Sequence, residues 1–215
     1  MEQPLVSILI RTCGRPHILR MALNSILEQT YKNIGVIIVE DGNNASEEML
    51  KRDYGQLSYI YEATGQKVGR CEVGNRAMKL ATGMYMNFLD DDDAFFPEHI
   101  ERLVNEIEHS SERAVYSIAE ERQIIPNEKE YTQSVVKNKM IRYKQPFNRL
   151  LLYTMNYIPI QSILFERTLF EELGGLDKTL DTLEDWDLWV RYSTVTDFKY
   201  IEQVTSCYHT PYQRK

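Results

Sequence analysis

The stretch Gly83-Met84-Tyr85-Met86-Asn87-Phe88-Leu89-Asp90-Asp91-Asp92-Asp93 decides how the rest of the chain is interpreted. Its apolar first part predicts a buried strand that ends near Leu89. Four carboxylates follow at once, and they repel one another and lose solvation beside an apolar strand. Magnesium or manganese would relieve that repulsion, because these cations prefer oxygen ligands. We therefore expect a divalent-cation site here, with a solvated acidic turn as the simpler alternative.

Strands and helices alternate on both sides of this stretch. Short apolar runs predict strands over 5–10, 34–40, 57–61 and 83–89. Helical spacing and end signals predict helices over 17–28, 46–51, 70–81 and 98–108. Short links between such elements are typical of the α/β class, with a mostly parallel central sheet and helices on both faces. Ligands of these sheets bind beyond the carboxyl ends of the strands, where the acidic run lies.

The second half of the chain is less regular. We expect a strand over 114–119, a surface hairpin or mobile excursion over 120–144, and a short helix over 146–156. A strand over 158–165, helices over 167–173 and 183–192, and closing strands over 198–208 complete the expected elements. A soft boundary near residue 110 divides one domain into a half over 1–110 and a smaller mixed half over 111–215.

The composition limits the classes of function. The 215 residues carry a net charge of −7, which argues against a nucleic-acid partner. Three widely spaced cysteines, an odd number without metal-binding spacing, are typical of reduced thiols in the cytoplasm. Residues 1–4 lack the features of a signal peptide, and no apolar run of the sequence is long enough for a transmembrane segment. The sequence therefore predicts a cytoplasmic protein.

No glycine-rich phosphate loop follows the first strand. Residues 11–16 read Arg-Thr-Cys-Gly-Arg-Pro, without the G-x-G-x-x-G pattern of dinucleotide-binding sites. The sequence also lacks the G-x-x-x-x-G-K-[ST] loop. Phosphates would therefore have to be bound in another way. A cation on the acidic run can neutralise a diphosphate leaving group.

Five segments, in this order and spacing, resemble the inverting family-2 glycosyltransferases, which have the A-type nucleotide-sugar-binding fold. The resemblance runs from Val6 to about Tyr208, and the acidic run corresponds to the DXD motif of that family. It implies a nucleotide-sugar-binding half before the boundary near residue 110 and an acceptor-binding, catalytic half after it. The matching segments are residues 6–12, 25–31, 36–42, 83–93, and 174–177 followed by 184–191.

The resemblance implies a reaction and its participants. A sugar would move from a nucleotide-diphosphate donor, expected to be a UDP-sugar, to a hydroxyl of a glycan or lipid-linked acceptor. The anomeric configuration would be inverted, Mn²⁺ or Mg²⁺ would be the cofactor, and polysaccharide biosynthesis would be the setting. A lipid-linked acceptor would add peripheral contact with the cytoplasmic face of the membrane.

The resemblance also assigns residues to the nucleotide. Thr12 would line the base pocket, and Asp41 would accept a hydrogen bond from the base, although beside Gly42 it also suits a plain turn. Many members carry Arg where this chain has Gly74, and Arg70 is expected to supply that charge. The residues expected to contact the nucleotide are Thr12, Arg15, Asp41, Arg70, Asn75 and Asp91.

Metal binding is assigned to the acidic run. Asp92 is the main expected ligand, and Asp91 would reach the ribose or the metal. Asp90 and Asp93 would orient the loop. His209 could be a further metal ligand, although a lone histidine is more often structural.

A second acidic pair, Glu184-Asp185, starts the helix expected over 183–192. Exposed N–H groups favour carboxylates at helix starts, so capping explains the pair without any chemistry. Trp186 and Trp189 could form a sugar-stacking wall or belong to the core. The resemblance places both carboxylates in the catalytic site and makes Asp185 the base that takes the proton from the acceptor hydroxyl.

Other functions stay open on the sequence. A nucleotidyltransferase of similar fold usually carries a Gly-rich basic loop after the first strand, where this chain has only Gly14. A non-catalytic nucleotide-sugar-binding module would not need both Asp92 and Asp185. A glycoside hydrolase also uses two carboxylates, but a tandem acidic run at a strand end suits a metal better.

Overall fold

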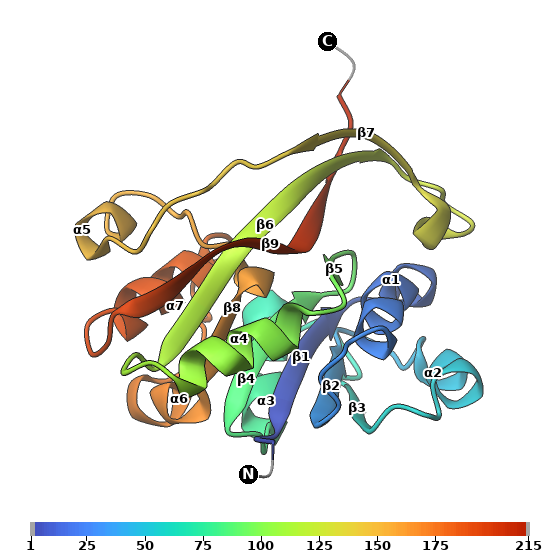
Figure 1. Ribbon diagram of the computed structural model, residues 1–215. Helices are drawn as coiled ribbons and strands as arrows, with labels where there is room; N and C mark the ends of the chain where they lie inside the picture. The colour runs from blue at the N-terminus through green and yellow to red at the C-terminus, as the bar shows by residue number, and fades with distance from the viewer. Residues whose placement is uncertain (1–2, 214–215) are drawn as a thin grey trace.

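The computed structural model describes residues 3–213. Within this range nine strands form one sheet in the order β3-β2-β1-β4-β8-β6-β9-β5, and β7 pairs with β6 (Figure 1). Met1 and Glu2, part of the expectation about a signal peptide, lie outside the described residues. Across 3–213, none of the helices has both the length and the apolar character that a bilayer span requires.

The first half of the chain forms the parallel part of the sheet. Strands β1 (Val6–Thr12), β2 (Ile34–Glu40), β3 (Tyr59–Ala63) and β4 (Tyr85–Asp90) pair in parallel. Helices α1 (Pro16–Leu27), α2 (Glu47–Asp53) and α3 (Arg70–Leu80) connect them. These elements are the ones that the apolar patterns predict, displaced by a few residues at most. The carboxyl ends of the strands share one edge, and the acidic run follows β4 there.

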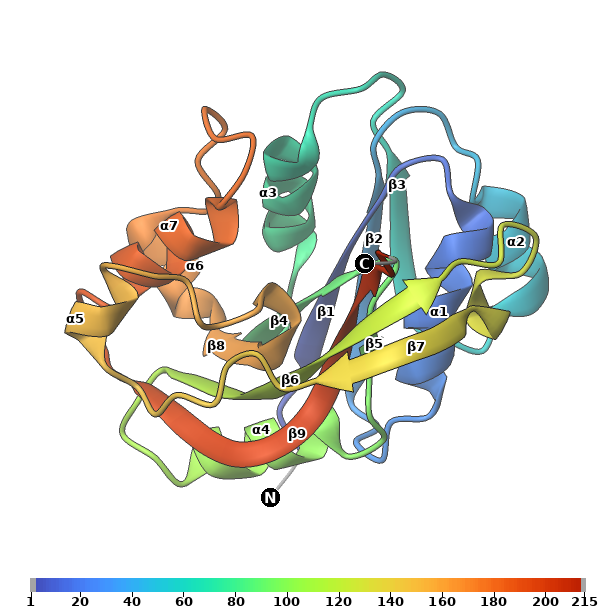
Figure 2. The ribbon, with the colours of Figure 1, turned by 90° about the horizontal axis from the view of Figure 1, so that it is seen from above.

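The core lies in two clusters, one on each face of the sheet. Along β1, Ile8 and Ile10 pack with α1, α2 and α4 (His99–Glu108). Leu9 between them points the other way, toward α3, α6 (Arg167–Leu173) and α7 (Glu184–Tyr192). Figure 2 shows α3, α6 and α7 on one side of β1, with α1 and α2 on the other. The expected α/β class with helices on both faces is confirmed.

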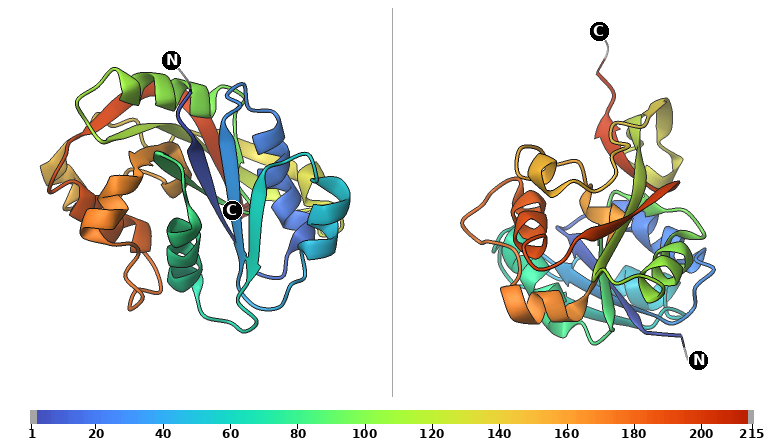
Figure 3. Two further views of the ribbon diagram at one scale, coloured as in Figure 1. Left: turned by 90° about the horizontal axis from the view of Figure 1, so that it is seen from below. Right: turned by 60° about the vertical axis from the view of Figure 1, so that its left-hand side comes forward.

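The second half of the chain adds mixed pairing. Strand β8 (Ile163–Glu166) lies antiparallel between β4 and β6 (Ala114–Ile125), and β9 (Phe198–Pro211) runs parallel to β6. The segment 120–144 contains the end of β6 and the whole of β7 (Val135–Met140), paired as a hairpin across the top of Figure 1. Helix α4 packs against β6 and β9 (Figure 3).

Three expectations about this half are wrong in their limits. The helix expected over 146–156 is the short α5 (Arg149–Leu152). The strand expected over 158–165 begins only at Ile163, because a 3₁₀ turn forms first, in which Ser162 Oγ donates to Pro159 O at 2.7 Å. The closing strands are one strand, β9, which also pairs with β5 (Ala94–Phe95) just after the acidic run. This pairing brings the end of β9 beside the acidic run.

Candidate active site

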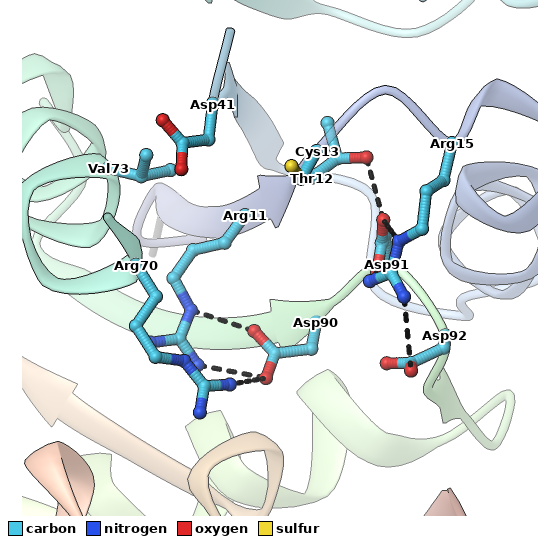
Figure 4. A pocket seen from close by; sticks show the side chains of 10 residues that line it. All are labelled: Arg11, Thr12, Cys13, Arg15, Asp41, Arg70, Val73, Asp90, Asp91 and Asp92. Atoms are coloured by element: carbon cyan, nitrogen blue, oxygen red, sulfur yellow. Dashed lines mark hydrogen bonds and ion pairs between the residues drawn. The ribbon is translucent and has the colours of Figure 1, made fainter. Parts of the chain in front are cut away.

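The carboxyl ends of β1, β2 and β4 meet the start of α3 at a pocket of about 290 Å³, called here the donor pocket. In Figure 4, Arg11, Arg70 and Asp90 lie on one side of it, and Arg15, Asp91 and Asp92 lie on the other. This is the edge of an open α/β sheet where ligands bind. The lining residues are Arg11, Thr12, Cys13, Arg15, Asp41, Arg70, Val73, Asp90, Asp91 and Asp92.

Arg11 is a buried cation between two carboxylates. Its Nε and Nη2 each lie 2.8 Å from an oxygen of Asp90, and its Nη1 lies 2.9 Å from Oε1 of Glu184. Burial alone would lower the pKa of the Arg11 guanidinium, but the Asp90 and Glu184 carboxylates raise it above its ordinary value. The cluster ties the ends of β1 and β4 to the start of α7. The sequence patterns did not point to Arg11, although a charge at the end of a buried strand is an available signal.

Glu184 is enclosed by positive charge. It is 3% exposed, and the oxygen that meets Arg11 also lies 3.2 Å from Arg70 Nε. Both guanidinium groups therefore contact the same carboxylate oxygen. Glu184 therefore anchors α7, and the catalytic role expected for it stays a prediction. Arg70 is half exposed and lines the pocket, so its contact with a nucleotide stays a prediction.

Asp91 is buried and is held by residues at the end of β1 and in the loop after it. Thr12 Oγ1 donates to Asp91 Oδ2 at 2.7 Å, and Arg15 forms an ion pair with the same carboxylate. Burial raises the pKa of Asp91 to about 6, against the hydrogen bond from Thr12 and the charge of Arg15. Asp91 therefore already has protein partners, while Thr12 and Arg15 still line the pocket.

His209, near the end of β9, lies beside Asp92 of the acidic run. Asp92 lines the pocket, with Arg15 Nη1 at 4.0 Å, and burial together with the Asp90 carboxylate raises the pKa of Asp92. His209 Nδ1 lies 2.6 Å from Asp92 O, and His209 N donates to Asp93 Oδ1 at 3.1 Å. Because a carbonyl oxygen only accepts, Nδ1 carries the proton and Nε2 carries a lone pair. Burial lowers the pKa of His209, so the ring is neutral near pH 7.

The Asp92 carboxylate and His209 Nε2 are atoms of the kind that bind a divalent cation, and a bound molecule would supply the other ligands. Histidine ligands commonly donate their other ring N–H to a backbone carbonyl, as His209 does. Within residues 3–213, no group of three or more His, Cys, Asp or Glu side chains is arranged to hold a metal ion. Magnesium is usually bound by one or two carboxylates together with substrate phosphates. Asp92 and His209 therefore stay the residues expected to hold a divalent cation, whose remaining ligands would be phosphate oxygens and water.

Asp41 faces the same pocket and fixes the loop before α3. Its Oδ1 accepts from Val68 N at 2.7 Å, and its Oδ2 accepts from Gly69 N at 3.2 Å. Gly42 after it has a φ of 122°, a conformation that favours glycine. Asp41 therefore holds the loop before α3, and Gly42 has the backbone conformation of the turn considered beside it. Each carboxylate oxygen has a second lone pair, so contact with a base stays a prediction.

Asn75 lies behind the pocket instead of facing it. Its Nδ2 donates to Leu176 O at 2.8 Å, and its Oδ1 accepts from Leu176 N at 2.7 Å. The side chain joins α3 to the loop after α6 and does not line the donor pocket, and its expected contact with the nucleotide stays a prediction. A Cβ at Gly74 would lie 2.6 Å from Leu176 Cδ1, so a larger residue there would require the Leu176 side chain to move.

Asp185 lies at the start of α7. Its Oδ2 accepts from Asn156 Nδ2 at 3.0 Å, and its Oδ1 lies 2.8 Å from Trp186 N. Burial raises the pKa of Asp185, and the hydrogen bond from Asn156 opposes this. A raised pKa improves a carboxylate as a general base near neutral pH. Asn156 was missed, because a lone asparagine in a loop gives no sequence pattern.

The two tryptophans do not form an exposed wall. Trp189 is fully buried in the core cluster beside Phe165. Trp186 is half buried, and its Nε1 donates to Leu152 O at 2.6 Å. Both therefore have the core role that was considered as the alternative to sugar stacking.

The fold and the donor pocket define an A-type glycosyltransferase architecture. The family described as Glycosyl transferase family 2 matches residues 7–174, and this chain belongs to that family. An uncharacterized glycosyltransferase of Rickettsia prowazekii is 29% identical over 204 residues, which are 94% of this chain and 62% of that protein. Uncharacterized glycosyltransferase YwdF of Bacillus subtilis is 32% identical over 187 residues, 86% of this chain and 67% of that protein. This chain thus spans about three fifths of the Rickettsia relative.

Solved structures show the same fold. Staphylococcus aureus TarS has a TM-score of 0.78 at 14% identity, over 96% of this chain and 37% of that chain. TarS 1–349 in complex with UDP-GlcNAc has a TM-score of 0.75 at 14% identity, over 98% of this chain and 60% of that chain. The expected A-type fold is therefore confirmed.

Proposed function

We propose that this chain transfers a sugar from a nucleoside-diphosphate donor to a hydroxyl group of a glycan or lipid-linked acceptor, with inversion. The observation that carries the proposal is the separation of two carboxylate sites. Asp92 lies in the donor pocket, and Asp185 lies at the start of α7, which the bond between Arg11 and Glu184 ties to that pocket. One site can serve the leaving diphosphate, and the other can serve the attacking hydroxyl.

The proposed donor is a UDP-sugar. Family membership and the likeness in fold to TarS, which was crystallised with UDP-GlcNAc, support this choice. Asp41 and Thr12 line the pocket at the ends of two neighbouring strands, where a uracil could be held. Arg15 and Arg70 provide guanidinium groups for the phosphates, to which they could donate charge-assisted hydrogen bonds.

Asp92, with His209, would hold Mg²⁺ or Mn²⁺ at the diphosphate end of the donor. Such a cation supplies charge neutralisation to the departing diphosphate. Asp91 is less suited as a ligand, because Thr12 and Arg15 already contact its carboxylate.

Asp185 acts as the base in the proposed reaction. It takes the proton from the acceptor hydroxyl while that oxygen attacks the anomeric carbon. The new carbon–oxygen bond forms on the face opposite to the breaking bond, and UDP leaves with its electron pair. One displacement of this kind inverts the configuration and needs no covalent intermediate on the enzyme.

Asp92→Ala is expected to abolish the manganese dependence of UDP binding and to leave the fold intact, because losing one of four crowded carboxylates relieves repulsion. Calorimetry of UDP binding with and without manganese measures the effect. Asp197→Ala is the matched control, since Asp197 is an exposed carboxylate paired with Arg149. Full manganese dependence in Asp92→Ala would remove Asp92 from the metal site, and a wild-type chain that binds no UDP would contradict the proposed function.

Asp41→Ala is expected to weaken UDP binding by about 1–3 kcal/mol, the scale of a lost hydrogen bond to a charged group. Asp41→Asn distinguishes the contact with the nucleotide base from the contact with the loop before α3. The amide oxygen of the variant can still accept from Val68 N. Equal losses in both variants would assign the effect to the base contact. An unchanged affinity of Asp41→Ala in calorimetry would leave Asp41 with its turn role alone.

A further inference from the structure

A second cavity, of about 330 Å³, lies beside the start of α7. None of its lining residues lines the donor pocket. Strands β6 and β9, the segment after β7 and the residues around Asn156 all contribute to it. We call it the α7 cavity, and its lining residues are Glu121, Arg142, Tyr143, Asn156, Pro159, Leu183, Tyr208 and Thr210.

One wall of the α7 cavity is organised by Glu121, a buried carboxylate of β6. Its Oε2 lies 2.6 Å from Arg142 Nε and 3.2 Å from the Tyr208 hydroxyl, and its Oε1 accepts from Thr210 Oγ1 at 3.0 Å. The hydrogen bond from Arg142 lowers the pKa of Glu121, so the carboxylate stays ionised. Glu121 therefore fixes three polar side chains in one arrangement, while the Arg142 side chain remains 49% exposed.

Leu183 forms another part of the wall in a strained conformation. Its φ of 61° and ψ of 23° are left-handed, and the side chain is 54% exposed. Leucine rarely adopts this conformation, and such strain is concentrated at ligand sites. Leu183 immediately precedes Glu184 and Asp185, so its backbone sets the direction in which α7 starts.

Asn156 connects the α7 cavity to the proposed base. It lines the cavity, and its Nδ2 donates to Asp185 Oδ2 at 3.0 Å. Asn156 is thus shared between the cavity wall and the proposed base. Tyr143 and Tyr208 add aromatic surface next to the polar groups, a combination that suits the two kinds of surface on a sugar ring.

We propose that the α7 cavity binds the terminal sugar ring of the acceptor, with Arg142 and Tyr208 at its hydroxyls and Asn156 as a positioning residue for Asp185. The proposal rests on the proposed function and adds the class of acceptor, a sugar with free ring hydroxyls. The volume of the α7 cavity suits one sugar ring, because it lies near the lower end of the range for small-molecule sites, about 300–1,000 Å³.

Saturation-transfer NMR with methyl glycosides of glucose, galactose and N-acetylglucosamine tests binding in the presence of UDP and manganese. At least one glycoside is expected to receive saturation from the wild-type chain. The signal should fall at least fivefold in Arg142→Ala, which removes donors, and in Thr210→Trp, which fills the cavity. Asn138→Ala, a change on exposed β7 outside the cavity, is the matched control and should keep the wild-type signal.

The outcomes separate this proposal from the proposed function. Wild-type protein that binds UDP but no glycoside, or folded Arg142→Ala and Thr210→Trp variants with full signals, would overturn the acceptor site alone. A wild-type chain that binds no UDP would instead contradict the donor assignment. Circular dichroism of each variant establishes that the fold is retained.

Asn156→Ala tests the positioning role through the pH dependence of UDP-sugar hydrolysis, with water as the acceptor. Asp185 must be ionised to act, so the rate rises as pH rises through its pKa. Removing the Asn156 hydrogen bond raises this pKa, so the acid limb should move to higher pH and the plateau rate should fall about tenfold. A merely structural loss would lower the rate without moving the limb, and an unmoved limb would remove Asn156 from this role.

Discussion

Arg11→Met is expected to lower the free energy of unfolding by about 3–5 kcal/mol, the scale for removing one partner of a buried ion pair. The substitution roughly preserves the length of the side chain, but Asp90 and Glu184 lose the cation that they share at 2.8 and 2.9 Å. Arg11 is 6% exposed, so water cannot readily take its place. Arg70, at 3.2 Å from Glu184 and 3.8 Å from Asp90, limits the loss. Urea denaturation followed by circular dichroism measures the change.

Two further variants make this result specific. Arg20→Met removes the partly exposed ion pair with Asp53 and should cost less than about 1 kcal/mol. Glu184→Gln in the Arg11→Met background removes one uncompensated charge and should restore part of the lost stability. If Arg11→Met were no less stable than Arg20→Met, the cluster would not be what holds α7 against the sheet.

The parallel half of the fold could be predicted because strands β1, β2 and β4 are largely buried on both faces. Residues 34–40 form a continuous apolar run that ends in a turn, and the structure has β2 over the same residues. The end of β6 gives no such signal, since it extends beyond the helices and pairs with the exposed β7. The run over 158–165 is mostly apolar, yet its first part closes a turn, because apolar burial alone does not distinguish a strand from a turn.

The candidate site could be predicted only in part, for a related reason. Four carboxylates after a buried strand give the place of the donor pocket, since the end of a strand fixes the edge of the sheet. Their partners come from distant parts of the chain: Arg11 and Glu184 are 173 positions apart, and Asn75 and Leu176 are 101 apart. Sequence spacing carries no information about such contacts. The contacts of Glu184 and Asn75 could not be predicted for that reason.

Glu184 and Asp185 illustrate how adjacent residues receive different roles. Consecutive residues on a helix point about 100° apart, so two neighbouring carboxylates cannot face the same group. Glu184 points to Arg11 and Arg70, and the two ion pairs fix the position of its side chain. Asp185 points to Asn156 and has an environment that raises its pKa. The helix start therefore contributes one anchor and one candidate base.

Asp185→Asn is expected to lower the rate of sugar transfer about 100-fold or more, the scale for losing a positioned general base. The variant keeps the size of the side chain and the start of α7, and its amide oxygen can still accept from Asn156. UDP binding should survive, because Asp185 does not line the donor pocket. A panel of sugars and lipid-linked glycans with labelled UDP-sugars identifies an acceptor, and the rate of product formation then measures the effect.

Asp187→Asn is the matched control for this result, because it makes the same chemical change two residues later on the same helix. Asp187 is ion-paired with Arg191 one turn further along and does not contact Asn156, so its variant should transfer sugar at nearly the wild-type rate. Equal rates in Asp185→Asn and wild type would remove Asp185 from the mechanism. The wild-type product should carry the anomeric configuration opposite to that of the donor, as one displacement requires. A product with retained configuration would contradict the single displacement even if Asp185 proved essential, because the carboxylate would then have to act through a different step.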